Sequence, residues 1–105
     1  MLLHSEIEAN AIIPFLRTIV AKKLIEKYDL TQQQAATKLG ITQATISNYK
    51  NRSRENIELY LITKRIQSFA DDIAVMIMKN TSEIEISEMF ETTLQFIREQ
   101  NIIYD

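Results

Sequence analysis

The chain contains a single glycine, Gly40, which stands between two short segments that each begin with a threonine. Glycine adopts a left-handed backbone at no steric cost, so it often ends one helix and opens a tight turn. The sequence therefore predicts one helix that ends at Leu39 and a second that begins just after Thr42. Two short helices joined by such a turn form a helix-turn-helix unit.

Both helices of this unit carry start signals. Thr31 is followed three residues later by Gln34, the spacing of a capping box in which each side chain satisfies a backbone N–H group. Thr42 is the predicted N-cap of the second helix. Ile41 and Ile46 flank this cap at the spacing of a hydrophobic staple, which fixes the direction from which the chain enters the helix.

The inward side of the unit can also be predicted. Ala36 lies four residues before Gly40, where a closely crossing helix requires a small side chain. Larger apolar side chains should face the interior at four positions: Leu39, Ile41, Ile46 and Tyr49.

This stretch resembles the helix-turn-helix of the lambda-repressor-like, or XRE-type, transcription regulators. The resemblance is carried by Gln32, Ala36, Leu39-Gly40-Ile41, Thr42-Gln43-Ala44-Thr45, Ile46 and Tyr49. The preceding Ile13-Pro14-Phe15-Leu16-Arg17 is similar to the layout of small archaeal regulators of this type. The resemblance implies an all-α, lambda-repressor-like helix-turn-helix bundle that binds double-stranded DNA.

The resemblance also implies that the second helix lies in the major groove with its N-terminal residues against base edges. The base-reading residues would then be Gln43, Ala44, Thr45, Ser47 and Asn48. Their chemistry agrees, because Gln and Asn can pair with adenine through two hydrogen bonds and an alanine methyl can contact a thymine methyl. No arginine is among them, so we expect no strong preference for guanine.

Phosphate contacts are predicted around the same helix. Gln32 opens the first helix, whose positive dipole end favours a backbone phosphate. The other candidates are Thr42, Lys50, Asn51, Arg52 and Arg54. Residues 31–54 carry four basic and no acidic residues, whereas the rest of the chain carries eight basic and fourteen acidic ones. A positive segment on an acidic body is expected of a surface that faces phosphates.

Composition argues against several other classes of protein. The 105 residues suit one domain, and 46% hydrophobic with 25% charged residues suits a packed globule. The sequence has no cysteine, one histidine and no apolar run of about 18 residues, so we expect no catalytic site, cofactor, metal or membrane span. The lack of cysteine fits the expectation of a cytoplasmic protein, and no signal-peptide pattern is visible. No small-molecule effector is indicated.

The N-terminal residues predict two helices before the unit. Ser5 and Glu8 have capping-box spacing, which predicts a helix from about Glu6 to Ile13. Pro14 should break or kink it and start a second helix that runs to about Tyr28. The buried face of that second helix is predicted to be Leu16, Val20, Leu24 and Tyr28, flanked by Ile13, Ala21 and Ile25.

Residues 55–79 lack glycine and proline and predict one long helix. Its apolar residues alternate three and four apart, as in a coiled-coil seam: Leu59, Ile62, Ile66, Phe69, Ile73 and Met76. Ser82 and Glu85 have capping-box spacing. The alternation in residues 83–87 leaves helix and short strand both open, and residues 87–100 predict a helix.

These patterns divide the chain into a DNA-binding part, residues 1–54, and a C-terminal helical dimerisation part, residues 55–105. The predicted two-fold interface is Ile66, Phe69, Ile73, Met76, Ile77, Phe90, Leu94 and Ile97. The expected function is sequence-specific transcriptional regulation by a homodimer on a palindromic operator. The alternative is a helix-turn-helix used for protein contact, as in an antitoxin or adaptor subunit. A further alternative is that the predicted interface only fills the core of a monomer.

Overall fold

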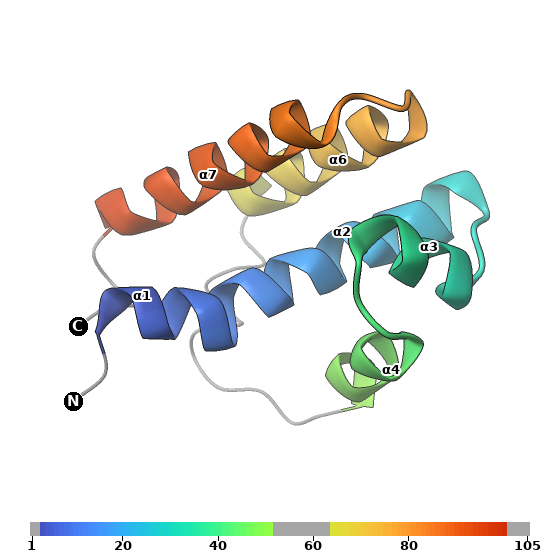
Figure 1. The fold of residues 1–105 in the computed structure, drawn as a ribbon, viewed down its shortest axis with the longest axis horizontal. Helices are drawn as coiled ribbons and strands as arrows, with labels where there is room; N and C mark the ends of the chain where they lie inside the picture. The colour runs from blue at the N-terminus through green and yellow to red at the C-terminus, as the bar shows by residue number, and fades with distance from the viewer. Residues whose placement is uncertain (1–2, 52–63, 101–105) are drawn as a thin grey trace.

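The computed structural model describes residues 3–51 and 64–100, without the side chains of residues 4 and 48–51. Every regular element in this part of the chain is helical, in agreement with the predicted all-α class (Figure 1). The elements are α1 (His4–Ile7), the π-helix η1 (Glu8–Ile12), α2 (Ile13–Tyr28), α3 (Gln32–Leu39), α4 (Gln43–Asn51), α6 (Lys64–Met78) and α7 (Glu83–Gln100). Among these described helices, none is long and apolar enough to cross a membrane.

The first helix does not begin where the sequence predicted. α1 begins at His4, and the Glu6 carboxylate accepts a hydrogen bond from the Leu3 backbone N–H at 3.2 Å. The predicted cap formed by Ser5 and Glu8 is therefore wrong. The Glu8 carboxylate instead accepts hydrogen bonds from the Arg98 guanidinium of α7, at 2.7 and 2.8 Å. A guanidinium binds a buried carboxylate more strongly than a backbone N–H does.

Pro14 lies in the first turn of α2, as predicted, but it does not separate two helices. The chain is helical from α1 through η1 into α2, and the Ile13 N–H bonds the Glu8 carbonyl with the longer reach of a π-turn. Proline lacks an N–H and its ring crowds the preceding turn. A wider turn immediately before Pro14 relieves that crowding and keeps the helical run continuous.

The central helix of the fold is α2, with α3, α4 and α6 packed around it (Figure 1). The predicted residues Leu16, Val20, Ala21 and Leu24 are buried, but Phe15, Thr18 and Ile19 are buried as well. The prediction of a single buried face was therefore incomplete. A helix with neighbours on several sides is apolar around most of its circumference, so one stripe does not describe it.

Three helices end with a residue in the left-handed conformation. These residues are Asp29 with φ 58°, Gly40 with φ 68° and Asn80 with φ 56°. At each end, a backbone N–H beyond the helix bonds a carbonyl five or six residues back: Ile41 to Ala36 and Thr81 to Met76 span five residues, and Leu30 to Leu24 spans six. Asn and Asp adopt this conformation more readily than other non-glycine residues, which explains why glycine is needed only once.

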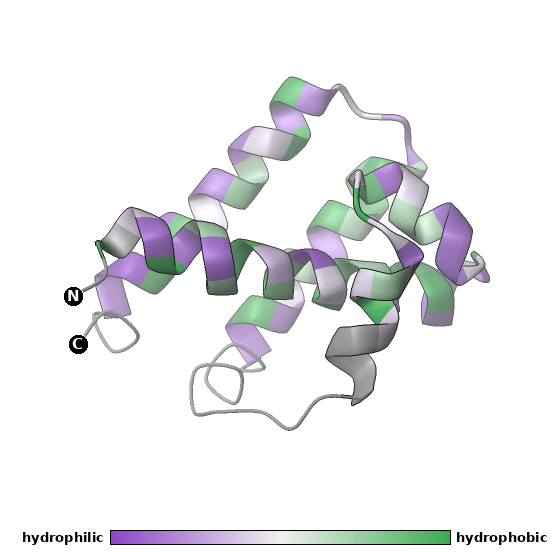
Figure 2. Cartoon of the chain, turned by 60° about the horizontal axis from the view of Figure 1, so that its bottom comes forward, coloured by the Kyte–Doolittle hydropathy of each residue, from purple (hydrophilic) through white to green (hydrophobic). Residues whose placement is uncertain are grey.

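Helices α6 and α7 form an antiparallel pair, and α6 packs against α2 (Figure 1). The Ser82 hydroxyl accepts a hydrogen bond from the Glu85 N–H at 3.3 Å, which confirms Ser82 as the cap of α7. Residues 83–87 are helical, so the choice between helix and strand is settled. Figure 2 shows hydrophobic and hydrophilic residues interleaved along the helices, as expected when amphipathic helices share one core.

Most of the predicted dimer interface lies in the core of the single chain. At most a tenth of each side chain is exposed for Ile66, Phe69, Ile73, Ile77, Leu94 and Ile97. Met76 and Phe90 are half-buried. This burial favours the alternative that these residues fill the core of a monomer, because residues packed within their own chain have little surface left for a partner. The seam positions Leu59 and Ile62 lie outside the described residues.

Ion pairs connect the elements that surround α2. Asp71 of α6 accepts from Lys27 at 2.8 Å and lies 3.4 Å from Lys23, both on α2. The hydrogen bond from Lys27 lowers the pKa of Asp71, and the same bond raises the pKa of Lys27. Hydrogen bonds to Glu8 and Glu91 raise the pKa of Arg98, so this guanidinium stays charged and connects η1 to α7.

Candidate nucleic-acid interface

The start of α3 is fixed by the predicted capping box. Thr31 Oγ1 accepts a hydrogen bond from the Gln34 backbone N–H at 3.1 Å, and Gln34 Oε1 accepts one from the Thr31 backbone N–H at 2.9 Å. The helix ends at Leu39, and Gly40 caps it in the left-handed conformation. Both predictions about this helix are confirmed.

The start of α4 is fixed by Thr42. Its hydroxyl accepts a hydrogen bond from the Thr45 backbone N–H at 3.1 Å and shares a second one with the Thr45 hydroxyl at 2.8 Å. The helix begins at Gln43, directly after Thr42, as predicted. The cap satisfies the Thr45 N–H, one of the backbone donors in the first turn. The exposed side chains of this turn are therefore free for other contacts.

Small and branched apolar residues hold α3 and α4 against α2. Ala35 and Ala36 are buried, which lets the helices approach closely, and Ile46 is 2% exposed. Ile41, at the other end of the predicted staple, is partly buried against the same core. Ala36 therefore lies where the sequence predicted. The inward position predicted for Tyr49 falls on a side chain outside the described set.

The predicted base-reading residues that the structure describes lie at the start of α4. Gln43 and Ala44 are exposed, whereas Thr45 and Ser47 are half-buried. The Thr45 hydroxyl is engaged with Thr42, so it has less capacity for a base than Gln43 has. The Asn48 side chain is outside the described set.

A pair of hydrogen bonds joins the two helices at this surface. Gln32 Oε1, on the first residue of α3, accepts from Gln43 Nε2 and from Ser47 Oγ, both at 3.4 Å. These are long bonds, and they leave the Gln32 amide nitrogen for another partner. The sequence predicted a phosphate contact for Gln32 but not its connection to the reading residues. The sequence did contain a signal for this connection: Gln32 and Gln43 are the first residues of the two helices of the unit.

The remaining phosphate candidates are described only in part. Thr42 is exposed, but its hydroxyl caps α4. The side chains of Lys50 and Asn51, and the residues Arg52 and Arg54, lie outside the described set. In the part of the chain that is described, no group of His, Cys, Asp and Glu residues is arranged to hold a metal ion.

The comparisons with known proteins agree with this geometry. Residues 22–57 match the family model described as Helix-turn-helix, a range that contains the end of α2, all of α3 and all of α4. The fold and the match together define this segment as a DNA-binding helix-turn-helix domain. The domain is of the XRE type, the type that the sequence resembles. Searches of curated proteins and of solved structures found no match.

Proposed function

We propose that this protein is a sequence-specific regulator of transcription that reads double-stranded DNA with the first turns of α4. The observation that carries the proposal is the group formed by Gln32, Gln43 and Ser47. The Gln43 side chain is exposed, it belongs to a capped helix, and a residue of α3 orients it. An amide held in this way is suited to pairing with adenine through two hydrogen bonds.

Contacts to phosphates would place this helix on the duplex. The proposed residues are Gln32 and Thr42, at the starts of α3 and α4, together with Lys50, Asn51, Arg52 and Arg54, which are proposed from the sequence alone. These contacts release counterions, so they give affinity that is independent of base sequence and falls with salt. Asn48 is proposed from the sequence as a further base contact.

We also propose that the protein acts as a homodimer on a palindromic operator. A single unit contacts few base pairs, and a two-fold dimer reads two half-sites about one helical turn apart. Apart from Phe69, which lies under the Arg65 guanidinium, the contact must lie outside the buried residues described above. The outward groove between α6 and α7 is the proposed surface, with a volume of about 580 Å³.

The charges of this groove are suited to contact with a second copy. The Arg65 guanidinium lies 4.9 Å from the ring centre of Phe69 and 5.6 Å from that of Phe96, on the groove floor. Glu88 and Glu99 line the same groove. A surface that carries both a cation over aromatic rings and carboxylates can pair with its own two-fold image, as an isologous interface requires.

Sedimentation would test the dimer. The intact chain is expected at twice the 12.2 kDa of the monomer, and Arg65→Glu should shift it toward the monomer. Lys64→Glu is the matched control, because Lys64 is exposed next to Arg65 and does not line the groove. A wild-type chain that remains monomeric while binding a palindromic site with full affinity would contradict the dimer proposal.

Selection of binding sites from random DNA, at stated salt, tests the function itself. A regulator should enrich one sequence with two inverted half-sites. A protein-contact module of the antitoxin or adaptor kind should enrich none and show only weak, salt-sensitive binding. The second result would contradict sequence-specific regulation.

A further inference from the structure

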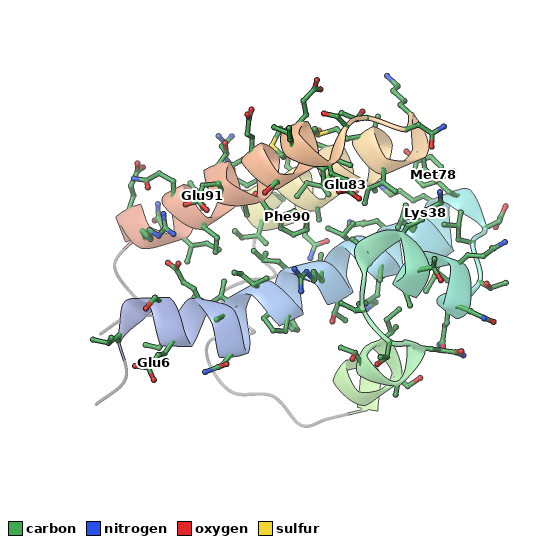
Figure 3. All side chains as sticks on the ribbon, viewed as in Figure 1. Glu6, Lys38, Met78, Glu83, Phe90 and Glu91 are labelled. Carbon is green, nitrogen blue, oxygen red and sulfur yellow. The ribbon has the colours of Figure 1, made fainter. Side chains whose placement is uncertain are left out.

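A cavity of about 450 Å³ lies between the helix-turn-helix unit and α7. Its walls come from four helices and include Ile13 of α2, Leu39 of α3, Ile77 of α6, and Phe90 and Leu94 of α7. Figure 3 shows Phe90 on the side of α7 that faces α2. The volume is typical of sites for small molecules, and the walls combine apolar side chains with polar and charged ones.

The cavity also has cations. Arg17 of α2 is half-buried in its wall, and it makes no ion pair or hydrogen bond with any residue in the described part of the chain. Lys38 of α3 lies at the rim and is exposed (Figure 3). A half-buried guanidinium with apolar neighbours favours an anion, because its charge is only partly hydrated.

Two carboxylates also line the cavity, but one of them is already paired. Glu91 accepts a hydrogen bond from Arg98 at 2.8 Å. Glu83 lies in the first turn of α7, where a negative charge interacts with the helix dipole. Two cations, Arg17 and Lys38, and a single unpaired carboxylate, Glu83, therefore line the cavity together with its apolar side chains.

We propose that this cavity binds a small carboxylate with an apolar tail. The carboxylate would accept hydrogen bonds from the Arg17 guanidinium, whose planar fork fits it, with Lys38 adding charge at the rim. The tail would pack against Ile13, Phe90 and Leu94. Neither the fold class nor the proposed DNA contacts require such a site.

The position of the cavity gives this site a regulatory consequence. Leu39 and Gly40 line it, and they form the turn that places α4. A ligand that contacts this turn and α7 together would favour one placement of α4 over others. Any change that it causes in DNA affinity would be matched by an equal change in ligand affinity caused by DNA.

Binding can be measured without DNA, so its failure is separate from failure of the proposed function. The probe is octanoate, titrated into the intact protein while the Gly40 amide is followed by nuclear magnetic resonance. Gly40 is the only glycine, which makes its signal easy to identify. We expect a saturable shift of this signal. Octanamide, which has the same tail without the charge, should bind more weakly than octanoate, by about tenfold or more.

Two variants test the residues. Arg17→Gln should weaken octanoate binding by about tenfold or more and remove the preference over octanamide. Lys22→Gln, an exposed cation on the same helix that does not line the cavity, should bind like wild type. Ser87→Phe places a large side chain in the cavity wall and should block octanoate, which provides a second test if Arg17→Gln does not fold.

Several results would overturn the site. These are a Gly40 signal that does not respond to octanoate, equal binding of octanoate and octanamide, or full octanoate affinity in a folded Arg17→Gln protein. If Arg17→Gln does not fold, full affinity in Ser87→Phe overturns it.

Discussion

Gln32 and Gln43, which open consecutive helices, are joined by a side-chain hydrogen bond of 3.4 Å from Gln43 Nε2 to Gln32 Oε1. The capping box that starts α3 therefore also affects the surface of α4. Thr31 and Gln34 fix the start of α3, this start places Gln32, and Gln32 orients Gln43. A side chain that is already oriented loses less conformational entropy when it pairs with a base.

Replacing Gly40 tests the turn. Gly40 has φ 68°, and a Cβ built there meets no atom within 4 Å, so the only cost of Gly40→Ala is the left-handed backbone. We expect a loss of about 1–2 kcal/mol in the free energy of unfolding, measured by urea denaturation. Gly40→Asn should lose less, because Asn tolerates this conformation. An alanine variant as stable as wild type would mean that the turn does not need a left-handed residue.

Enlarging Ala36 tests the close approach of the helices around the unit. Ala36 is 3% exposed, so Ala36→Leu should overpack the core and lower stability by about 1–3 kcal/mol in thermal or urea unfolding. Gln33→Leu is the control, since Gln33 is an exposed residue of the same helix. Equal melting temperatures for the two variants would show that Ala36 is not buried.

The ion pairs of Asp71 predict how stability depends on pH. Its folded pKa lies below the ordinary value of 3.8, chiefly because of the hydrogen bond from Lys27. The stabilisation is therefore fully present above pH 3.8 and is lost as the pH falls through the folded pKa. The stability difference between wild type and Asp71→Asn should shrink in that range. Asp72→Asn, a change at the exposed neighbouring residue, should show no such trend.

The Arg98 guanidinium should contribute to stability through its buried partner. The Glu8 side chain is only 10% exposed. Arg98→Gln therefore removes the guanidinium that donates two hydrogen bonds to this buried carboxylate. We expect a loss of about 1–3 kcal/mol in the free energy of unfolding. Glu91→Gln should lose clearly less, because the Glu91 side chain is 62% exposed. Similar losses for both variants would contradict a special role for the pair with Glu8.

The sequence predicted well wherever the determinants were local. The cap at Thr31, the turn at Gly40 and the start of α4 after Thr42 each depend on residues within one helical turn, and all three are confirmed. The exposed positions of Gln43 and Ala44 follow from the same register. Local hydrogen-bonding preferences at helix ends were sufficient for these predictions.

The predictions failed where distant residues decide the outcome. The Ser5 and Glu8 spacing indicated a cap, but Arg98, ninety residues from Glu8, binds the Glu8 carboxylate. The stripe containing Ile66 and Ile73 has coiled-coil spacing, but it packs within its own chain. The sequence could not show this, because periodicity does not distinguish a helix of a partner chain from another helix of the same domain. The cavity beside Arg17 is formed by four helices, and no short stretch of sequence could indicate it.

The most direct test of base reading by α4 compares wild type with Gln43→Ala on the selected site and on a scrambled duplex at one salt concentration. The account predicts a loss of about 1–3 kcal/mol on the selected site and almost no change on the scrambled one. Gln32→Ala should lower affinity for both, because it removes a phosphate contact as well as the orienting bond. A Gln43→Ala protein that binds the selected site as tightly as wild type would contradict the account.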